Sequence, residues 1–488
     1  MQETFIGREK ELAALKELYL QNSFQLFVLY GRRRVGKTTL LNEFSKDKDT
    51  IFYSAEQSNN KLNLEKFSAL VFQFYGEKNL EPFSSWTNAL SYIDDRQRDK
   101  RLILIIDEFP YLVKKNKALL SELQHVIDHK LRNGNLFIVL CGSYMGFMEK
   151  EVLGSKSPLF GRRTAQLHMK PFHYLTSAKF LDGFSEEDKL KLYGAFGGTP
   201  LYLQQIRKDD SFEENIKRAF LRVTAYLYEE PLLLLRQEVQ EPGVYSAIIE
   251  AIAGGYSKAN EISNKIGEDS AKCLKYIKTL CELGILYKET PFGEKESSRK
   301  TIYGISDFMF RFWYRYVFTN RTLIETDAGQ AVWLKRIEPD YNHYMGLVFE
   351  KICADYLCML NAVGELPFLF TAVGRWWGTD PATRSQTEID LIASDGRNYV
   401  VGECKWRNEK IGLEVLQKLR QKADIFNSNR EQTWFVLFSK SGFTEAVQHE
   451  AQRCDDVILI DRAQLMSGTG GSRNEAVYAG NVGNKRLL

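Results

Sequence analysis

The chain has 488 residues, which is too many for one hydrophobic core, so about three or four domains are expected. Its apolar content of 44% and charged content of 26% are ordinary for a soluble globular protein, and a net charge of +3 permits nucleic-acid binding without arguing for it. The seven cysteines are odd in number and include no CxxC pair, which argues against a disulfide framework and against a thiolate zinc site.

The N-terminal segment and the apolar runs indicate a cytoplasmic protein. The segment begins with alternating charges and has no apolar h-region, so no signal peptide is expected. No apolar run approaches the ~18 residues that span a bilayer, so no membrane contact is expected.

Residues 1–175 alternate strand-like apolar runs with helical stretches. This is the rhythm of an α/β fold with a parallel, doubly wound sheet. We therefore expect one α/β domain here, with strands at Leu26–Tyr30, Thr50–Ser54, Leu102–Ile106 and Leu136–Cys141.

A phosphate-binding loop follows the first of these strands. The pattern Gly31-x-x-x-x-Gly36-Lys37-Thr38 lies directly after a strand and opens a helix, which is the context that a P-loop requires. Glycines let backbone N–H groups close around phosphate oxygens, Lys37 supplies a positive charge, and Thr38 places a hydroxyl on Mg²⁺. ATP with Mg²⁺ is the expected ligand, and the predicted contacts are Gly31, Arg32, Arg33, Arg34, Val35, Gly36, Lys37, Thr38 and Thr39.

Two acidic residues at the end of a later strand complete the expected ATPase site. In "RLILIIDEFPYL", five apolar residues precede Asp107 and Glu108. Asp107 is predicted to hold Mg²⁺ through water, and Glu108 to polarise the water that attacks the γ-phosphate.

Other residues of the first domain are weaker candidates. Ser143 is predicted to sense the γ-phosphate, although a small residue in a turn would look the same. Arg162 or its neighbour Arg163 is a candidate arginine finger, with a surface or structural arginine as the alternative. Gly7 and Arg8, within "FIGREKEL", are expected to lie against the adenine.

The order of these motifs resembles a known family. "FIGREKEL", "GRRRVGKTTL", "LILIIDEFPYL", "GSYMGFMEKEVLGSKSPLFGRRT" and "GGTPLYL", followed by a winged helix, is similar to the archaeal-type ATPases, which are P-loop proteins close to the STAND and AAA+ groups. The resemblance covers about residues 4–320. It implies that Gly197–Pro200 is a lid motif that reports the nucleotide state, and it implies no settled biological role.

Two helical regions follow the first domain. Residues 176–240 show apolar residues at helical spacing and are predicted to form a helical lid. Residues 241–320 read as three short helices and a β-hairpin, which match a winged helix-turn-helix. Lys272, Lys275 and Lys278 form a basic stripe on the third helix, which favours DNA contact, although a solvated face in a protein-binding module would look the same. The apolar face of that helix is predicted to consist of Leu274, Ile277, Leu280 and Cys281.

Residues 321–465 are predicted to form a second α/β domain, and residues 466–488 a disordered tail. The expected elements are a helix over 343–357, strands near 367–373, 387–393 and 398–406, a helix near 411–427 and a strand over 433–439. Asp395-Gly396 is a hairpin signal. A two-residue turn there would pair Ser394 with Arg397 and Asp390 with Val401.

The hairpin gathers acids and a lysine on one face. Because side chains alternate along a strand, Asp390, Glu403 and Lys405 share a face, with Glu403 diagonally across from Asp390. Carboxylate oxygens suit Mg²⁺ or Mn²⁺, and such a metal with a nearby lysine is typical of phosphodiester hydrolysis.

This pattern resembles the PD-(D/E)xK nuclease superfamily, whose core runs α-β-β-β-α-β. The resemblance implies that Glu350, Asp390 and Glu403 are metal ligands and that Lys405 is catalytic. The Pro-Asp of the superfamily name is Ile389-Asp390 here. A surface salt-bridge cluster and a nuclease fold that binds without cutting both remain as alternatives.

The sequence thus predicts an ATP-hydrolysing P-loop protein coupled to DNA binding and to metal-dependent DNA cleavage. The alternatives are an ATP-driven signalling switch with an inert nuclease-like domain, and a transcription regulator that uses only the winged helix. DNA is expected to bind through the winged helix and the C-terminal domain, and a homo-oligomer or a protein partner is left open.

Overall fold

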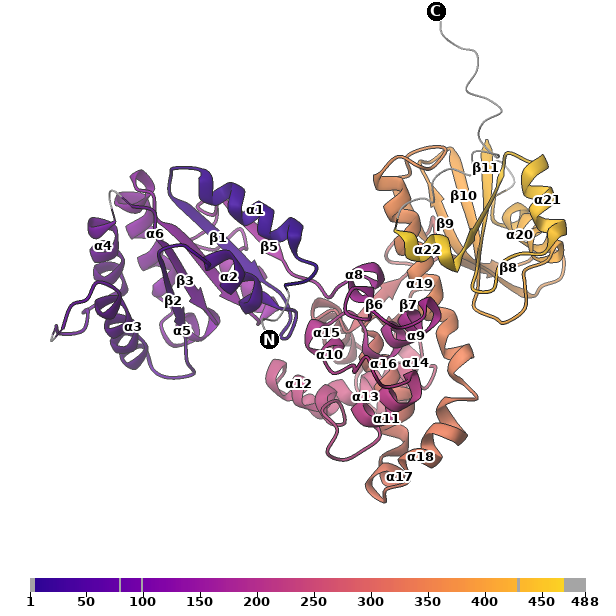
Figure 1. Cartoon of the computed structure of the whole chain (residues 1–488), viewed down its shortest axis with the longest axis horizontal. Coiled ribbons are helices and arrows are strands. Elements are labelled where there is room, and N and C mark those ends of the chain that lie inside the picture. Colours follow the sequence, from indigo (N-terminus) through magenta and orange to yellow (C-terminus); the bar gives the residue numbers. More distant parts are fainter. Residues whose placement is uncertain (1–4, 79, 98–99, 428–430, 469–488) are drawn as a thin grey trace, which may run out of the picture. The chain divides into compact units, whose positions relative to one another are not determined.

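The structure is a computed structural model that describes residues 5–78, 80–97, 100–427 and 431–468. The chain divides into two compact units (Figure 1). The first comprises the chain up to Phe172 together with Thr199–Leu201 and Glu282–Gly284, and the second comprises the rest. No helix within the described residues is both long and apolar enough to cross a membrane.

The first unit is built on a five-stranded parallel sheet with the strand order β2-β3-β4-β1-β5. The four strands predicted from the sequence are present. The apolar runs of β1, β3 and β4 are buried on both faces of the sheet, whereas in β2, at the sheet edge, only Ile51 and Tyr53 are buried. The fifth strand was missed, since its sequence AQLH carries two polar residues and lies at the sheet edge. The bounds are β1 Gln25–Tyr30, β2 Thr50–Ser54, β3 Ile103–Asp107, β4 Phe137–Gly142 and β5 Ala165–His168.

Helices cover both faces of this sheet, which gives the predicted doubly wound α/β arrangement. Alternate residues of β1 contribute to two separate cores: Phe27 and Leu29 pack with Leu15 of α1 and Leu40 of α2, whereas Val28 packs with residues of α3 to α6. The helices are α1 Glu9–Leu20, α2 Lys37–Ser45, α3 Asn60–Phe74, α4 Trp86–Arg96, α5 Pro110–Lys115, α6 Leu119–His129, η1 Leu131–Asn133, α7 Met145–Phe147 and η2 Met148–Val152.

The second unit begins with helices and a small antiparallel sheet in which β6 pairs with β7. Three helices, α13 to α15, precede that pair, as the sequence predicted. The predicted apolar face of α15 was partly wrong, because Leu274 is 42% exposed, whereas Cys273 and Tyr276 are buried. The elements are α8 Tyr174–Ala178, α9 Glu186–Phe196, α10 Pro200–Leu203, α11 Phe212–Phe220, α12 Glu230–Glu238, α13 Pro242–Ala253, α14 Ala259–Ile266, α15 Ser270–Glu282, β6 Leu286–Glu289 and β7 Ile302–Ile305.

An aromatic, largely buried helical segment connects these helices to the last part of the unit. Phe308, Phe312 and Trp313 have almost no exposed surface. The segment comprises α16 Phe308–Phe312, η3 Trp313–Val317, η4 Phe318–Asn320, α17 Arg321–Glu325, α18 Gly329–Val332 and η5 Trp333–Ile337.

The C-terminal part of the second unit is a mixed five-stranded sheet with the order β12-β11-β10-β9-β8. Strands β8, β9 and β10 are antiparallel neighbours, whereas β10, β11 and β12 run parallel. The helix-strand order matches the prediction from α19 to β11, but the first strand begins at Ala372 rather than near residue 367. The elements are α19 Tyr341–Ala362, β8 Ala372–Thr379, β9 Gln386–Ser394, β10 Asn398–Lys405, α20 Leu413–Phe426, β11 Gln432–Ser439, α21 Glu445–Arg453, β12 Val457–Asp461 and α22 Arg462–Ser467.

The predicted tail overlaps the end of this part. Residues 466 and 467 belong to α22 instead, and residues 469–488 lie outside the described residues.

The predicted hairpin register was wrong by two residues. Ser394 pairs with Tyr399, and Leu391 pairs with Gly402. The loop is longer than two residues because the Asp395 carboxylate accepts hydrogen bonds from the backbone N–H groups of Arg397 and Asn398, at 2.9 and 2.8 Å. A shift of two leaves every side chain on its predicted face.

The corrected register brings the two acids of the hairpin closer than predicted. Continuing it by one pair beyond Leu391 and Gly402 places Asp390 opposite Glu403 rather than diagonally across from it. The two carboxylates therefore start from directly facing positions on neighbouring strands.

Candidate functional sites

The P-loop joins the end of β1 to the start of α2 and is shaped by two glycines. A side chain at Gly31 would place its Cβ 2.3 Å from the backbone oxygen of Met169, so only glycine fits there. Gly36 caps α2 in the left-handed conformation, with φ of 93°. The loop thus delivers backbone N–H groups to the N-terminus of α2, as a phosphate cradle requires.

Side chains of the loop are already held in place. Lys37 is buried, and its ammonium donates to the backbone oxygens of Gly31 at 2.8 Å and Arg32 at 3.1 Å. Arg32 donates to the hydroxyl of Thr199 at 3.1 Å, and Arg33 donates to the Tyr111 hydroxyl at 2.7 Å. Among the other predicted contacts, Val35 is buried, Arg34 is half-buried and Thr39 is exposed.

The predicted acids lie at the carboxyl end of β3, beside the loop. The Thr38 hydroxyl donates to Asp107 at 3.1 Å, so the two proposed Mg²⁺-binding groups are in direct contact. Glu108 has a φ of 51°, a conformation that costs a non-glycine residue free energy and is often found at functional sites. Ser143 donates to both Glu108 carboxylate oxygens, at 2.9 and 2.7 Å. The predicted sensor therefore contacts the predicted water-polarising residue.

The N-terminal motif contacts the loop through Arg8. Its guanidinium donates to the backbone oxygens of Val35 at 3.1 Å and Lys170 at 2.6 Å, and it lies 4.1 Å from the centre of the Phe172 ring. Gly7, just before it, has a positive φ of 79°. Arg8 is thus hydrogen-bonded to the backbone of the P-loop.

The proposed arginine finger is engaged elsewhere in its own domain. Arg162 makes a two-pronged ion pair with Asp128, with distances of 2.9 and 2.6 Å, and also donates to two backbone oxygens of its loop. The hydrogen bond from Arg162 lowers the pKa of Asp128 below its ordinary value. Arg163 donates to the backbone oxygen of Leu153 at 3.3 Å.

The Arg162 pair yields a prediction about turnover. If Arg162 is structural, Arg162→Ala and Asp128→Ala should each lower the melting temperature only modestly, because a partly exposed ion pair contributes about 0–1 kcal/mol. Arg162→Ala should lower it slightly more, since it also removes two hydrogen bonds to backbone oxygens. ATP turnover per folded molecule should be unchanged in both variants. A large loss of turnover in Arg162→Ala alone would instead restore the finger assignment.

The candidate acid-lysine site of the second unit lies on β9, β10 and α20. Asp390 and Glu403 are 7% and 6% exposed. Asp390 accepts a hydrogen bond from the backbone N–H of Cys404 at 2.8 Å. Glu403 is held between two lysines, since Lys405 donates to it at 2.5 Å and Lys422 of α20 at 2.9 Å.

Lys422 could not be identified from the sequence. It lies in "LRQKADIF" on an ordinary amphipathic helix, where a lysine usually faces solvent. Only the packing of α20 beside the sheet brings its ammonium to Glu403, so no local pattern marks it.

A second group missed from the sequence is Arg375 on β8. Its guanidinium lies 3.3 Å from Glu350 of α19, 3.5 Å from Glu388 of β9 and 3.7 Å from Glu289 of β6. The backbone N–H of Phe292, just after β6, donates to the Arg375 backbone oxygen at 2.7 Å. The loop between β6 and β7 is therefore joined to the outermost strand of the C-terminal sheet.

Burial disfavours the ionised forms of two acids of this site, Glu350 and Asp390. Burial, together with the charges of Asp390 and Glu388, raises the pKa of Glu350 to about 8, although Arg375 opposes the shift. Burial and the charge of Glu403 raise the pKa of Asp390 to about 6. Additional positive charge at this place would favour the ionised forms.

These residues have the oxygen donors that Mg²⁺ or Mn²⁺ prefers, and one buried Glu350 oxygen accepts no hydrogen bond. In donor chemistry the site therefore fits a hard cation. No group of three or more acidic, histidine or cysteine side chains among the described residues is already arranged to hold a metal. The chain's own cations, Arg375, Lys405 and Lys422, lie against Glu350 and Glu403 instead.

The shifted pKa of Glu350 predicts a pH dependence of stability. Between its ordinary value of 4.5 and about 8, the folded state keeps a proton that the unfolded state has lost, so the free energy of unfolding should fall as pH rises. Glu350→Gln removes this titrating carboxyl. The free energy of unfolding of the variant, relative to that of the parent protein, should therefore increase as the pH rises through this range. Urea unfolding of both proteins at several pH values checks this, and parallel curves would contradict it.

Comparison with known proteins places the chain among its relatives. Residues 5–206 match a family described as an ATPase domain predominantly from Archaea, and residues 313–421 match one described as archaeal and bacterial proteins of unknown function. An uncharacterized protein of Methanocaldococcus jannaschii is 34% identical over 462 residues, which cover 94% of this chain and 99% of that protein. The chain belongs to this family of archaeal-type ATPases.

A more distant relative and a solved structure match smaller shares of this archaeal-type ATPase. An uncharacterized ATP-binding protein of M. jannaschii is 23% identical to this chain, and the match covers 57% of this chain and 87% of that protein. The Walker-type ATPase of Pyrococcus abyssi has 24% identity and a TM-score of 0.50, and covers 64% of this chain and 97% of its own. At this identity the structural likeness establishes the fold alone.

The two family matches cover different candidate residues of the archaeal-type ATPase. The ATPase match includes the P-loop and the acids after β3. The second match includes Glu350, Asp390, Glu403 and Lys405, and it ends one residue before Lys422. Because that family has no assigned function, the chemistry of the C-terminal site has to be argued from its residues.

Proposed function

We propose that this archaeal-type ATPase binds and hydrolyses ATP in its first unit, and that its C-terminal domain cleaves DNA with a divalent metal. The observation that carries the second half is the cluster of Asp390, Glu403 and Lys405 on adjacent strands, with Glu350 beside it. Buried acids with raised pKa values beside lysines are costly to keep and are concentrated at functional sites.

In the first unit, each proposed role follows from position. Lys37 would exchange its two backbone contacts for phosphate oxygens. Thr38 and Asp107 would hold Mg²⁺, which neutralises charge on the phosphates during hydrolysis. Glu108 would orient the attacking water, and the hydrogen bond from Ser143 would fix the direction of its carboxylate.

In the C-terminal domain, Glu350, Asp390 and Glu403 are the proposed ligands of Mg²⁺ or Mn²⁺. When bound, such a metal supplies a Lewis acid for phosphodiester hydrolysis. Lys405 and Lys422 would then be released from Glu403 to contact phosphate or to orient water, because the metal would satisfy the carboxylate. Lys422 joins the four sequence-predicted residues as a proposed member of the site.

The helices α13 to α15 with β6 and β7 are the proposed winged helix, and α15 is its proposed DNA-contacting helix. Lys275 and Lys278 are exposed on α15, while Lys272 pairs with Glu268 at 3.2 Å. Because the loop after β6 is joined to Arg375, we assign the phosphate contacts to α15 rather than to this loop.

A second function is favoured by one observation. Two acids of the C-terminal site, Glu350 and Glu403, are paired with the chain's own cations, as expected for an inert domain in an ATP-driven signalling switch. In that function the proposed winged helix and the C-terminal domain bind a protein partner.

A cleavage assay separates the two functions. Purified full-length protein is incubated with single-stranded, duplex and branched DNA in Mg²⁺ or Mn²⁺, with and without ATP, while ATP turnover is followed in the same samples. The nuclease proposal predicts metal-dependent cutting of at least one substrate. ATP turnover without cutting of any substrate, and without salt-sensitive DNA binding, would favour the signalling switch.

A further inference from the structure

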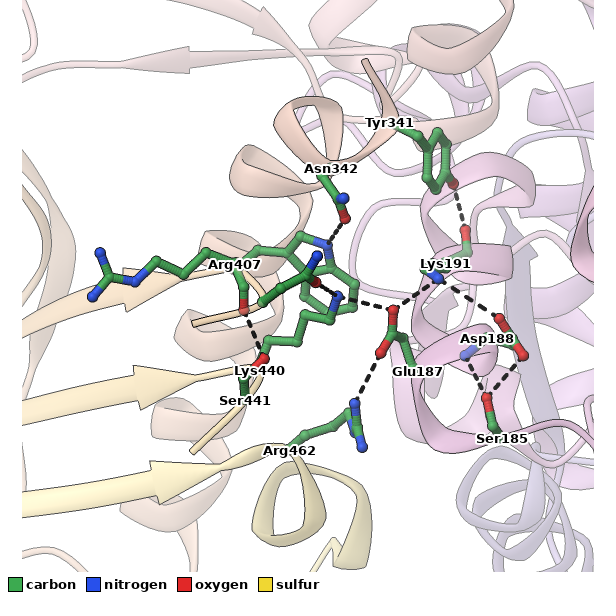
Figure 2. Close-up of polar contacts among 12 residues, drawn as sticks. Ser185, Glu187, Asp188, Lys191, Tyr341, Asn342, Arg407, Lys440, Ser441 and Arg462 are labelled. Atoms are coloured by element: carbon green, nitrogen blue, oxygen red, sulfur yellow. Dashed lines mark hydrogen bonds and ion pairs between the residues drawn. The ribbon is translucent and has the colours of Figure 1, made fainter. Parts of the chain in front are cut away.

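Lys440 is a buried charge that neither proposed site uses. It directly follows β11 and is 5% exposed. Its ammonium lies 2.9 Å from Glu187 (Figure 2). It also donates to the Asn408 side chain at 2.8 Å and lies 5.0 Å from the centre of the Trp406 ring. A lysine is rarely buried so completely unless it is paired, so Glu187 is the partner that permits this position.

Glu187 belongs to the first turn of α9, far from Lys440 in the sequence. Besides Lys440, it accepts from Arg462 of α22 at 3.1 Å and from Lys191 of its own helix at 2.7 Å (Figure 2). Two cations of the C-terminal domain therefore converge on one carboxylate of α9. Unlike a single exposed ion pair, this arrangement fixes the position of the helix end.

On the C-terminal side, the ion pair is directly linked to the candidate acid-lysine site. The backbone N–H of Lys440 donates to the backbone oxygen of Lys405 at 3.1 Å. The residues that hold the Lys440 ammonium, Trp406 and Asn408, belong to the segment that leaves β10 immediately after Lys405. A displacement of Lys440 would therefore act on the backbone of Lys405, which is the proposed catalytic lysine.

The other end of α9 leads to the P-loop contacts. The helix ends at Phe196 and is capped by Gly197, two residues before Thr199. Thr199 accepts the hydrogen bond from Arg32 of the P-loop, and the Pro200 ring lies 3.8 Å from where a side chain of Gly36 would be. Thr199 and Pro200 therefore lie against two residues of the P-loop, Arg32 and Gly36.

Helix α9 also packs on the helix that carries Glu350. The Tyr341 and Tyr344 hydroxyls of α19 donate to the backbone oxygens of Lys191 at 2.6 Å and Gly194 at 2.7 Å. An added Cβ at Gly194 would be 2.6 Å from the sulfur of Met345, so the two helices are in close contact. The helix is thus held at its start by Glu187 and along its length by α19.

We propose that α9 is a coupling helix that transmits nucleotide occupancy of the P-loop to the acid-lysine site through the Glu187–Lys440 ion pair. This inference rests on the proposed function for the meaning of the acid-lysine site, but the mechanical link does not depend on cleavage. A rearrangement of Thr199 and Pro200 around bound phosphate shifts the C-terminal end of α9. The shift reaches Glu187, then Lys440, and then the backbone at Lys405.

Hydrogen exchange of the full-length protein tests the link without any cleavage assay. Exchange is compared without nucleotide and with a non-hydrolysable ATP analogue plus Mg²⁺, in peptides that contain Trp406 or Lys440. The amide of Lys440 is informative because its hydrogen bond joins it to Lys405. The parent protein should show a nucleotide-dependent change in these peptides, and Lys37→Ala should not.

Glu187→Gln should lose this response while still binding the analogue, and Lys440→Met serves as a second variant from the other side of the pair. The matched control is Glu186→Gln, since Glu186 is the neighbouring carboxylate and lies 3.5 Å from Arg462 without contacting Lys440. No response in the parent protein, or a full response in folded Glu187→Gln, overturns the proposal. A coupled response in a protein that never cuts DNA would leave the link standing and refute only the nuclease.

Discussion

Lys37→Ala should abolish ATP hydrolysis, with a loss of turnover of about 100-fold or more, the range typical when a positioned charge-stabilising group is removed. The reason is local. In the structure the Lys37 ammonium is buried and donates to two carbonyl oxygens of the P-loop, so it is positioned where phosphate oxygens would enter. Lys37 is the first residue of α2, and the helix contains no second lysine. Alanine therefore leaves no cation at that position.

Lys46→Ala is the matched control for this experiment. Lys46 follows the same helix, is exposed and pairs with Glu43, so its loss should leave turnover and stability nearly unchanged. Turnover is measured as phosphate release by protein purified in the same way, with folding checked by thermal melting. Equal turnover in Lys37→Ala and the parent protein would show that the measured activity does not come from the P-loop.

Asp390→Asn should lower the rate of DNA cleavage by about three orders of magnitude. Asp390 is a proposed metal ligand, and a metal used as a Lewis acid stabilises the transition state by several kcal/mol. The substitution keeps the size of the side chain and its ability to accept from the Cys404 N–H. It removes one charge from a buried place where ionisation is already disfavoured. Cleavage should fall while ATP turnover stays at the parental level.

The stability of Asp390→Asn separates lost chemistry from lost folding. Burial and Glu403 raise the pKa of Asp390 from 3.8 to about 6, so ionised Asp390 destabilises the folded protein above that pH. The variant should therefore be at least as stable as the parent protein at neutral pH. Glu409→Gln, on the exposed segment after β10, is the control that removes an acid without effect. Residual cleavage equal to the parent's would exclude Asp390 from the reaction.

Much of the architecture could be predicted from the sequence because short patterns determine it. Apolar runs before Gly31 and Asp107 predict buried parallel strands, and the glycine spacing of the P-loop admits few other interpretations. Strand β5 was missed although AQLH alternates apolar and polar residues, because four residues are the shortest alternation that indicates a strand.

The acid-lysine site was predicted only in part because it is assembled from distant segments. Alternation along the strands placed Asp390, Glu403 and Lys405 on one face, and the shift by two residues kept them there because an even shift does not change the face. Turn length depends on how the Asp395 side chain caps the loop, which the dipeptide signal does not specify. Lys422 approaches only through the packing of α20.

The same limit applies to the charges that connect one region with another. Arg375, Glu187 and Lys440 each look like ordinary charged residues in the sequence, and only the folded chain shows which carboxylate each cation meets. Arg162 is a further case, because its place in a loop predicts an arginine finger but does not reveal its ion pair with Asp128.

A cleavage time course with and without ATP tests whether nucleotide binding in the first unit controls DNA cleavage by the C-terminal domain. The parent protein, Lys37→Ala and Asp390→Asn are incubated with the DNA substrate that is cut best, in Mg²⁺ or Mn²⁺. We expect that ATP changes the cleavage rate of the parent protein, that Lys37→Ala cuts at one rate regardless of ATP, and that Asp390→Asn does not cut. Equal cleavage by Asp390→Asn and the parent protein, or no cleavage of any DNA by a protein that turns over ATP, would contradict this expectation.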